Sequence, residues 1–222
     1  MEKAVIEGAI FDMDGLMFDT ESIWAELWPV ALAEFGCDCT QEFLHVSLGV
    51  NREVQEQIIR KHFGQDVPAS QVFDREEELV NERLRRDVPV KPGLPELLAW
   101  LERHEVPLAV ASASPMYMIE DCLAAAGVRD SFDVVFSADG MENGKPAPDV
   151  FLLAAEALGV EPTRTLVLED SHAGVRAGHA GNFITVMVPD QVPPTEEILE
   201  LADACCDNLH QVIELLEAGK LE

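Results

Sequence analysis

Two aspartates separated by one residue, Asp12 and Asp14, stand at the end of the first apolar run of the chain. This run predicts a buried strand over residues 5–14 that ends at Gly15, and residues i and i+2 of a strand share a face. Two carboxylates held this close repel each other unless a cation or a shared proton relieves them. An isolated Asp-x-Asp-Gly is more often a solvated turn, so a chemical role requires partners from the rest of the chain.

Further polar side chains follow three later apolar runs, at the point where each run ends. Because the carboxyl ends of parallel strands meet at one edge of a sheet, we expect these side chains to converge with the two aspartates. Three or four converging carboxylates form a hard oxygen site that suits Mg²⁺, which also takes a substrate phosphate as a ligand. The polar residues are Ser112 and Ser114, on either side of Ala113, after the second strand, Lys145 in the loop after the third, and Glu169 and Asp170 after the fourth.

This set of residues suits phosphoryl transfer. Serine hydroxyls and free N–H groups at a helix start, as at residues 112–115, hold phosphate oxygens. Lys145 can screen an attacking carboxylate from the phosphate that it approaches. Asp12 is then the nucleophile that forms an aspartyl-phosphate, and Asp14 is the general acid and base that protonates the leaving oxygen and activates water.

Short apolar strands alternate with amphipathic helices after residue 88, which predicts an α/β fold with a doubly wound, mostly parallel sheet. Ser114 is expected to cap a helix whose first position is Pro115, and Ser171 is expected to cap a later helix. The predicted strands after the first cover residues 107–112, 134–136, 165–168 and 184–188, with a short edge strand over 202–206.

Residues 20–86 carry apolar positions at helical spacing and no strand signal. We expect three helices here: one ended by Gly36, one capped by Asn51 and ended by Gly64, and one capped by Ser70. The sequence therefore predicts a core of residues 1–17 and 88–222, with a helical cap of residues 18–87 inserted after the first strand. Such a cap would act as a lid that excludes bulk water during the first transfer.

The bulk composition narrows the class of function. A formal charge of −27 over 222 residues argues against a nucleic-acid polymer or an anionic membrane surface as a partner. No apolar run approaches the length of a membrane span, and the first residues lack a signal-peptide pattern. Five cysteines without framework spacing indicate reduced thiols, so a cytoplasmic protein is expected, and nothing requires more than a monomer.

Four short segments stand at predicted strand ends, namely Phe11-Asp12-Met13-Asp14-Gly15, Ser112-Ala113-Ser114, Lys145-Pro146-Ala147-Pro148-Asp149 and Leu168-Glu169-Asp170-Ser171. Together they resemble the motifs of haloacid dehalogenase (HAD) superfamily phosphohydrolases, in the subgroup of β-phosphoglucomutase and small sugar-phosphate phosphatases. The resemblance covers nearly the whole chain and implies a Rossmann-like core with an inserted helical cap. It also implies Mg²⁺ held by Asp12, the backbone carbonyl of Asp14, and Asp170, with Glu169 close by.

The resemblance leaves a hydrolase and a mutase to be distinguished. The first of the four segments, residues 11–15, is motif one, and Thr20 follows it in this chain. Four residues after the corresponding threonine, β-phosphoglucomutase carries a histidine. This chain has Trp24 there, which cannot exchange protons with a sugar. The mutase cap loop resembles residues 48–52, with Leu48 in place of its lysine and Arg52 retained. Arg52 can bind a second phosphate or a polar substrate group. Trp24 and Arg52 are thus candidate substrate contacts, and the phosphatase is favoured.

The leading hypothesis is a Mg²⁺-dependent phosphatase that hydrolyses a small phosphate monoester, of sugar phosphate or nucleoside monophosphate type, through an aspartyl-phosphate. The first alternative is a phosphohexomutase that resembles β-phosphoglucomutase and releases no net phosphate. The second alternative is a binding protein that keeps the fold and has lost the chemistry. The intact set of acids, lysine and metal ligands argues against the second alternative.

Overall fold

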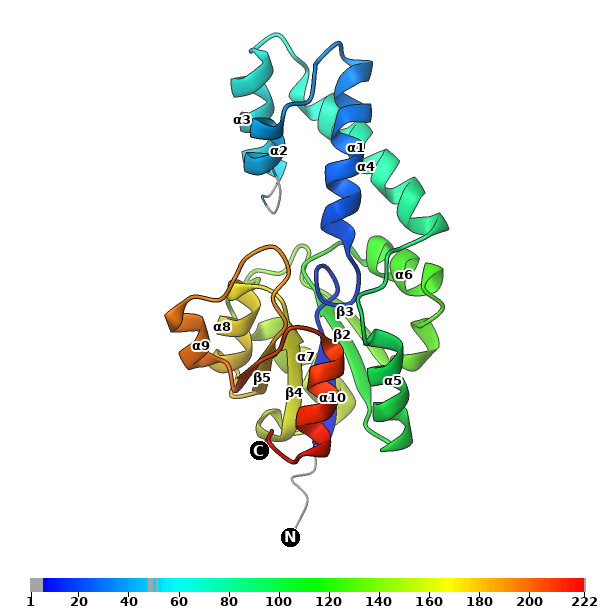
Figure 1. Ribbon diagram of the computed structural model, residues 1–222, viewed down its shortest axis with the longest axis vertical. Helices are drawn as coiled ribbons and strands as arrows, with labels where there is room; N and C mark the ends of the chain where they lie inside the picture. Colours follow the sequence, from blue (N-terminus) through cyan, green and yellow to red (C-terminus); the bar gives the residue numbers. More distant parts are fainter. Residues whose placement is uncertain (1–5, 48–49, 51, 222) are drawn as a thin grey trace. The chain divides into compact units, whose positions relative to one another are not determined.

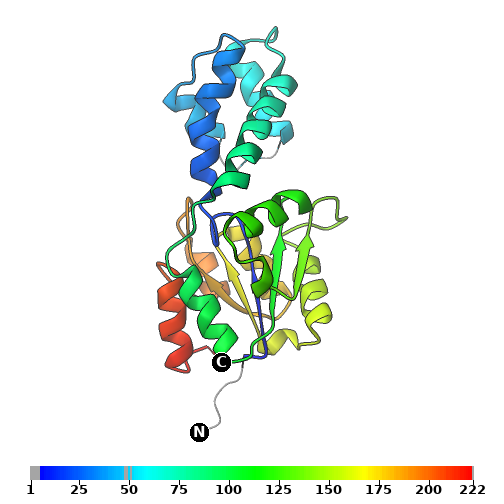
Figure 2. The same cartoon turned by 90° about the vertical axis from the view of Figure 1, so that its right-hand side faces the viewer.

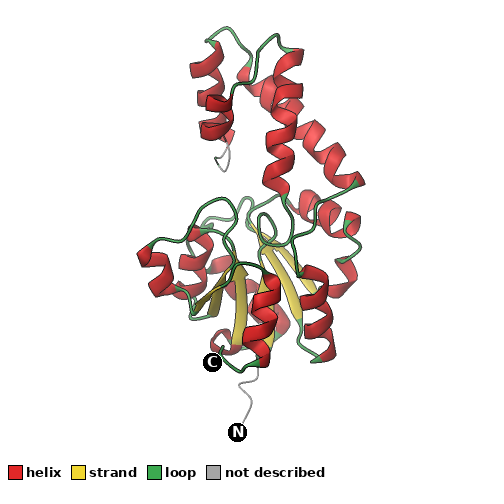
Figure 3. Ribbon diagram, in the orientation of Figure 1, coloured by secondary structure: helices red, strands yellow, loops and turns green. Residues whose placement is uncertain are grey.

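The computed structural model of the chain describes residues 6–47, 50 and 52–221. The chain forms two compact units, one made of Met1–Phe18 with Pro89–Glu222 and the other of Asp19–Val88. The first unit contains a parallel sheet with helices on both faces. The described part of the second unit contains helices and their connecting loops (Figure 3).

The sheet of the first unit has six strands in the order β3-β2-β1-β4-β5-β6, and every described pairing is parallel (Figure 1). The chain order reverses between β1 and β4, the position where ligands of doubly wound sheets bind. The predicted α/β sheet is confirmed. Its strands are β1 (Gly8–Phe11), β2 (Leu108–Ser112), β3 (Val134–Ser137), β4 (Thr165–Glu169), β5 (Ile184–Met187) and β6 (Ala204–Cys205).

Helices cover both faces of this sheet (Figures 1 and 2). Helices α7 and α8 pack against one face, and α5 and α10 lie together on the other. None of the described helices is both long enough and apolar enough to cross a membrane. The helices of this unit are α5 (Leu94–Arg103), α6 (Met116–Ala125), α7 (Asp149–Leu158), α8 (His172–Ala180), α9 (Glu196–Leu201) and α10 (Leu209–Glu217), with short 3₁₀ turns at Arg129–Ser131 and Pro162–Arg164.

The central strands are mostly apolar because both of their faces are covered, and Ser112 and Glu169 are polar residues at the carboxyl ends of β2 and β4. Every residue of β1, β2, β4 and β5 is buried. On the face toward α7, the side chains of Ile10, Ala109 and Val167 share one cluster with Phe151. The polar residues that follow these strands therefore project from rigid, closely packed elements.

The predicted extent of the first strand is wrong. Strand β1 ends at Phe11. The backbone N–H of Asp12 still donates to Leu168 O at 3.0 Å, a distance typical of a sheet hydrogen bond. Asp14 lies in a turn in which the N–H of Gly15 donates to Phe18 O, and Gly15 has φ +79°. A Cβ on Gly15 would lie 2.3 Å from Asp170 Oδ2, so glycine serves both the turn and the close approach.

Two predictions about the ends of elements also need correction. Helix α6 begins at Met116 with Pro115 as its N-cap, so Ser114 is not the capping residue. Ser114 lies one residue before that N-cap, and its hydroxyl donates to Asp14. The edge strand β6 has two residues, shorter than the predicted 202–206, and α9 and α10 were not predicted. Ser171 caps α8 as predicted, because its side chain accepts from the N–H of Gly174.

The second unit is built from α1 (Thr20–Glu34), α2 (Gln41–Ser47), α3 (Arg52–Phe63) and α4 (Ala69–Arg86). Its core contains Trp28, Leu32, Phe43, Ile59 and Val72. Helix α2 was not predicted. Helix α4 begins at Ala69, with Pro68 as N-cap, so the predicted cap at Ser70 is wrong, and the Ser70 hydroxyl accepts from Arg52. Leu48, Gly49 and the predicted cap Asn51 lie outside the described residues.

Helix α4 buries one carboxyl group that no described polar group satisfies. Glu76 is fully buried, and neither of its side-chain oxygens has a hydrogen-bond partner. It occupies the same helix face as the buried Val72 and Val80. Burial, with smaller contributions from Glu77 and Glu21, raises the pKa of Glu76 to about 10. Glu76 is therefore protonated at neutral pH, and its burial opposes folding of this unit.

We expect Glu76→Leu to stabilise the second unit and to raise its unfolding midpoint by several degrees. For a chain of this size, 1 kcal/mol shifts the midpoint by about 2–4 °C. As the pH rises from the ordinary pKa of a glutamate toward 10, the unfolded state loses the Glu76 proton and the folded state keeps it. The difference in midpoint between variant and wild type should therefore be larger at pH 8 than at pH 5. Tryptophan fluorescence reports mainly on this unit, since Trp24 and Trp28 belong to it.

The matched control is Glu82→Leu, at an exposed position of the same helix. A midpoint for Glu76→Leu at or below that of wild type at pH 8 would contradict the destabilising role of the buried carboxyl group.

Candidate active site

The centre of the site is a buried lysine between two carboxylates. Lys145 Nζ lies 2.5 Å from Asp12 Oδ1, 2.6 Å from Glu169 Oε1 and 3.0 Å from the Ala111 carbonyl oxygen. It also lies 4.7 Å from the centre of the Phe151 ring. Asp12 follows β1, Glu169 ends β4, and Lys145 comes from the loop between β3 and α7. Three segments distant in sequence thus meet at the carboxyl edge of the sheet.

The charges at this centre are strongly coupled because they are buried. Burial alone lowers the pKa of Lys145, but Asp12 and Glu169 outweigh it and raise that pKa above its ordinary value. Burial raises the pKa of Asp12, Lys145 opposes this effect, and Glu169 and Asp14 add to it. Burial also raises the pKa of Asp170, and the charges of Asp12 and Glu169 raise it further. One ammonium group does not balance the acids around it.

Three carboxylates lie close enough to hold one metal ion. Ligand oxygens of Asp12, Glu169 and Asp170 all lie within 4.8 Å of one another. Glu169 is already engaged: Oε1 accepts from Lys145, and Oε2 accepts from the N–H and the hydroxyl of Ser171, both at 2.9 Å. The acidic cluster can therefore bind a cation, mainly through Asp12 and Asp170, because both oxygens of Glu169 already accept hydrogen bonds.

Asp14 is held on a different side of the turn, by two serines. Its Oδ2 accepts from Ser114 Oγ at 2.6 Å and from Ser112 Oγ at 3.3 Å. The N–H of Ser114 donates in turn to Ser112 Oγ at 3.0 Å. Asp12 and Asp14 are near one another, but their side chains have different partners, lysine for the first and hydroxyl groups for the second. Ala113 lies exposed between the two serines.

A close approach of helix α8 to Glu169 explains the glycine at position 174. A Cβ on Gly174 would lie 1.7 Å from Glu169 Oε1, so any other residue at this position would displace the carboxylate. The N–H of Gly174 donates to Ser171 Oγ, the same hydroxyl that donates to Glu169. The sequence contains Gly174, but no local pattern predicts its contact with Glu169.

The two other candidate substrate contacts, Trp24 and Arg52, belong to the second unit, where both contact Phe73. The Arg52 guanidinium lies 4.9 Å from the centre of the Phe73 ring, and Trp24 stacks on Phe73 at 6.1 Å and 26°. Arg52 also lies 2.5 Å from Asp74 Oδ1 and 3.3 Å from Glu56 Oε1. Its charge is thus balanced by carboxylates of its own unit.

Sequence reasoning missed an ion pair beside this centre, between Lys91 and Asp190, whose atoms lie 2.5 Å apart. Asp190 follows strand β5 as Asp170 follows β4, so the same rule of polar residues at strand ends would have found it. Lys91 follows no predicted strand, and no sequence signal joins it to a residue 99 positions away.

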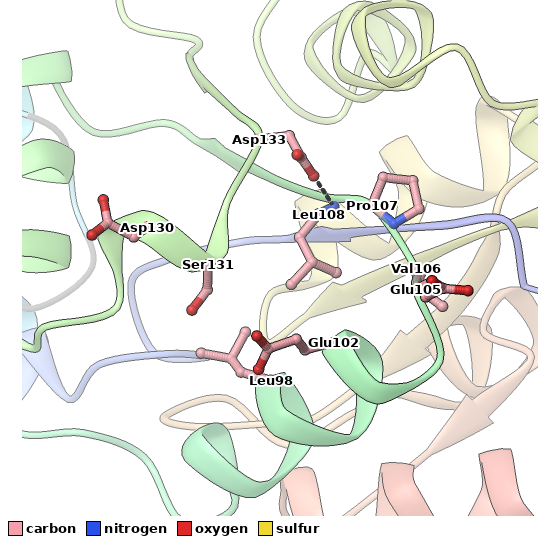
Figure 4. A pocket seen from close by; sticks show the side chains of 9 residues that line it. All are labelled: Leu98, Glu102, Glu105, Val106, Pro107, Leu108, Asp130, Ser131 and Asp133. Carbon is pink, nitrogen blue, oxygen red and sulfur yellow. Dashed lines mark hydrogen bonds between the residues drawn. The ribbon is translucent and has the colours of Figure 1, made fainter.

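A cavity of about 480 Å³ lies at the opposite edge of the sheet, near the amino end of β2. It is lined by residues of α5, the following loop and the 3₁₀ turn at Arg129–Ser131 (Figure 4). Asp133 at its rim accepts from the N–H of Leu108 at 2.9 Å, which gives this acid a structural role. None of the predicted site residues lines the cavity.

Comparison with known proteins identifies the family. The model of the haloacid dehalogenase-like hydrolase family matches residues 6–182. Hexitol phosphatase B of Escherichia coli (strain K12) is 32% identical over 213 residues, 93% of this chain and 94% of that protein. Fructose-1-phosphate phosphatase YqaB of the same strain is 32% identical over 182 residues, 82% of this chain and 95% of that protein. β-Phosphoglucomutase (pgmB) from Clostridium difficile has a similar fold, with a TM-score of 0.73, 25% identity and 97% of each chain covered.

The matched residues include all four segments on which the resemblance was based, and the structure brings their polar side chains to one edge of the sheet. The resemblance to this superfamily, in the subgroup of sugar-phosphate phosphatases and β-phosphoglucomutase, is confirmed. The chain is therefore an enzyme that belongs to the haloacid dehalogenase-like hydrolase family.

Proposed function

We propose that this enzyme is a Mg²⁺-dependent phosphatase that hydrolyses a small phosphate monoester through an aspartyl-phosphate formed on Asp12. The observation that carries the proposal is the buried contact of Asp12 with Lys145, with a ligand oxygen of Asp170 within 4.8 Å of one of Asp12. A buried carboxylate held by an ammonium group at the carboxyl edge of a parallel sheet is oriented for attack on an incoming phosphate.

The acidic centre fits a divalent cation. Three carboxylates share a space of 4.8 Å with a single ammonium group, and burial raises the pKa values of Asp12 and Asp170. Asp12, Asp170 and the backbone carbonyl of Asp14 would hold the ion, while Glu169 keeps its bonds to Lys145 and Ser171. Bound there, Mg²⁺ supplies the positive charge that neutralises these acids and the phosphate oxygens.

In the first transfer, an oxygen of Asp12 attacks phosphorus while the bond from phosphorus to the leaving oxygen breaks. Lys145 favours the ionised form of the attacking carboxylate and holds it in one orientation. Asp14 donates its proton to the leaving oxygen, so the alcohol departs uncharged. The hydroxyls of Ser112 and Ser114, which hold Asp14 in this structure, would be available to phosphate oxygens once Asp14 engages the substrate.

In the second transfer, Asp14 takes a proton from water, and the water oxygen attacks the phosphorus of the aspartyl-phosphate. The bond from phosphorus to Asp12 breaks, which releases inorganic phosphate and restores the Asp12 carboxylate. Asp14 thus gives one proton and regains one, so the enzyme returns to its starting state. The two aspartates can divide these tasks because their side chains have different partners.

For the second unit, Asp19–Val88, we propose the role of a cap that selects the leaving group. Trp24 and Phe73 provide an aromatic surface, and Arg52 provides a guanidinium group beside it. Such a surface suits a sugar or polyol, whose apolar C–H face packs on an aromatic ring while its hydroxyls bind polar groups. Since two relatives are named for phosphatases of hexitol phosphate and fructose 1-phosphate, a sugar or polyol phosphate is the preferred substrate class.

A mutase is the second candidate, because β-phosphoglucomutase is among the similar structures. A mutase must bind a bisphosphorylated intermediate again after it turns around, which requires a free cation in the cap. Arg52 is instead bound to Asp74 and Glu56, and Trp24 stands where the mutase carries histidine. These observations favour water as the final acceptor. A coupled assay for glucose 6-phosphate from β-glucose 1-phosphate would detect the mutase directly.

We expect Asp12→Asn to lower phosphate release from p-nitrophenyl phosphate and fructose 1-phosphate by at least about 1000-fold, because an amide cannot form the covalent intermediate. Chelation of divalent cations by EDTA should abolish release by the wild type, and added Mg²⁺ should restore it. The control is Asp130→Asn, at an exposed position of the first unit. Wild-type rates in Asp12→Asn would exclude Asp12 as the nucleophile.

We expect Lys145→Met to lower kcat by about 100-fold or more, because Asp12 loses the ammonium group that favours its ionised form and orients it. The variant should also unfold at a lower temperature, since breaking a buried ion pair costs about 3–5 kcal/mol. Steady-state kinetics and thermal unfolding measure both effects, with Lys220→Met, at an exposed position, as the control. An unchanged kcat would remove Lys145 from the reaction.

We expect the apparent affinity for Mg²⁺ to increase from pH 6 to pH 8. Asp12 and Asp170 have raised pKa values in the cation-free enzyme, so a fraction of each holds a proton that the cation must displace. Titration calorimetry in two buffers of different ionisation enthalpy would show this proton release. Binding that is independent of pH and releases no proton would mean that these carboxylates are not the ligands.

A further inference from the structure

The ion pair between Lys91 and Asp190 lies outside the four family motifs. Lys91 Nζ is 2.5 Å from Asp190 Oδ1, and the two side chains are only 20% and 10% exposed. Lys91 precedes α5, and Asp190 lies in the loop after β5. A pair this far from water gains little net stability, because desolvation offsets the attraction between its charges. Its position beside the acidic centre suggests another use.

Asp190 lies next to Asp170 across the turn of motif one. A Cβ on Gly15 would be 2.3 Å from Asp170 Oδ2 and 3.4 Å from Asp190 Cβ, so both acids adjoin the same point of that turn. The ligand oxygens that lie within 4.8 Å of one another belong to Asp12, Glu169 and Asp170. Asp190 is outside that group, so any effect it has on a cation acts through Asp170 or through the turn.

The ion pair also connects two backbone segments that carry motif residues. The N–H of Lys91 donates to Met17 O at 2.9 Å, and Val90 pairs with Phe18, so Lys91 is tied to the turn that contains Asp14 and Gly15. On the other side, the N–H of Val188 donates to Glu169 O at 2.7 Å, two residues before Asp190. The pair therefore joins the segment after β1 to the segments after β4 and β5.

We propose that Asp190 and Lys91 form a clamp that positions Asp170 against the turn of motif one, and so sets the affinity of the cation site. The inference rests on the proposed cation site, but not on which substrate is hydrolysed. Lys91 keeps the Asp190 carboxylate in place, and Asp190 limits the positions that the Asp170 carboxylate can take. Both are positioning residues, because neither is expected to touch the cation or the substrate.

The test is titration calorimetry of Mg²⁺ and of Mn²⁺ into the full-length protein. We expect Asp190→Asn and Lys91→Met each to weaken cation affinity by about tenfold, the lower end of the effect of groups that orient metal ligands. The double variant should be no weaker than either single variant, because the two residues act as one unit. Lys91→Arg, which keeps the charge, should retain most of the wild-type affinity.

The matched control is Glu197→Gln, which breaks the exposed ion pair of Glu197 with Arg176 in the same unit. It should leave cation affinity unchanged, and thermal unfolding of every variant shows whether the fold is intact. Wild-type affinity in a folded Asp190→Asn would overturn the clamp, and so would additive losses in the double variant. Failure of the wild type to bind either cation would also overturn it.

The clamp and the proposed function fail separately. If the variants bind Mg²⁺ less tightly while the wild type hydrolyses no phosphate ester, the clamp stands and the phosphatase does not. If the wild type binds Mg²⁺ and hydrolyses its substrate while Asp190→Asn binds as tightly as wild type, the phosphatase stands and the clamp does not.

Discussion

Negative charge confined to a buried edge of the sheet is the constraint on which the rest of the site depends. Asp12, Glu169 and Asp170 place ligand oxygens within 4.8 Å of one another, and Lys145 supplies a single compensating charge. Carboxylates at this distance would spread apart if their backbones could move. They are held because each follows or ends a strand that is buried on both faces, which leaves the backbone no room to relax.

The topology of the sheet brings these acids together. Strands β1 and β4 are direct neighbours, although more than 150 residues separate them, and the chain order reverses between them. Two glycines permit the final approach: Gly15 admits Asp170, and Gly174 admits Glu169. The same crowding that makes the centre costly therefore fixes its geometry to a precision that loops alone would not give.

The sequence predicted the parts of this arrangement that depend on local pattern. Apolar runs followed by polar residues placed Asp12, Lys145, Glu169 and Asp170 at one edge, and the structure brings them together there. It did not predict contacts between distant segments, such as Lys91 with Asp190, because no local signal encodes them. Ser114 illustrates a third case: the sequence predicts it as a helix cap, but α6 begins at Met116 with Pro115 as its N-cap, and the Ser114 hydroxyl donates to Asp14.

The two lysines near the site form ion pairs with carboxylates, and this limits how the site can attract an anion. In the described part of the first unit, Lys145 is bound to Asp12 and Glu169, and Lys91 to Asp190. A chain with a formal charge of −27 repels a phosphate dianion at long range. Both lysines already contact carboxylates, so under the proposed function the attraction would come from a bound cation and from N–H and hydroxyl groups after β2. Under the proposed function, such a site would bind its anionic substrate well only with the cation in place, so cation affinity would control the activity.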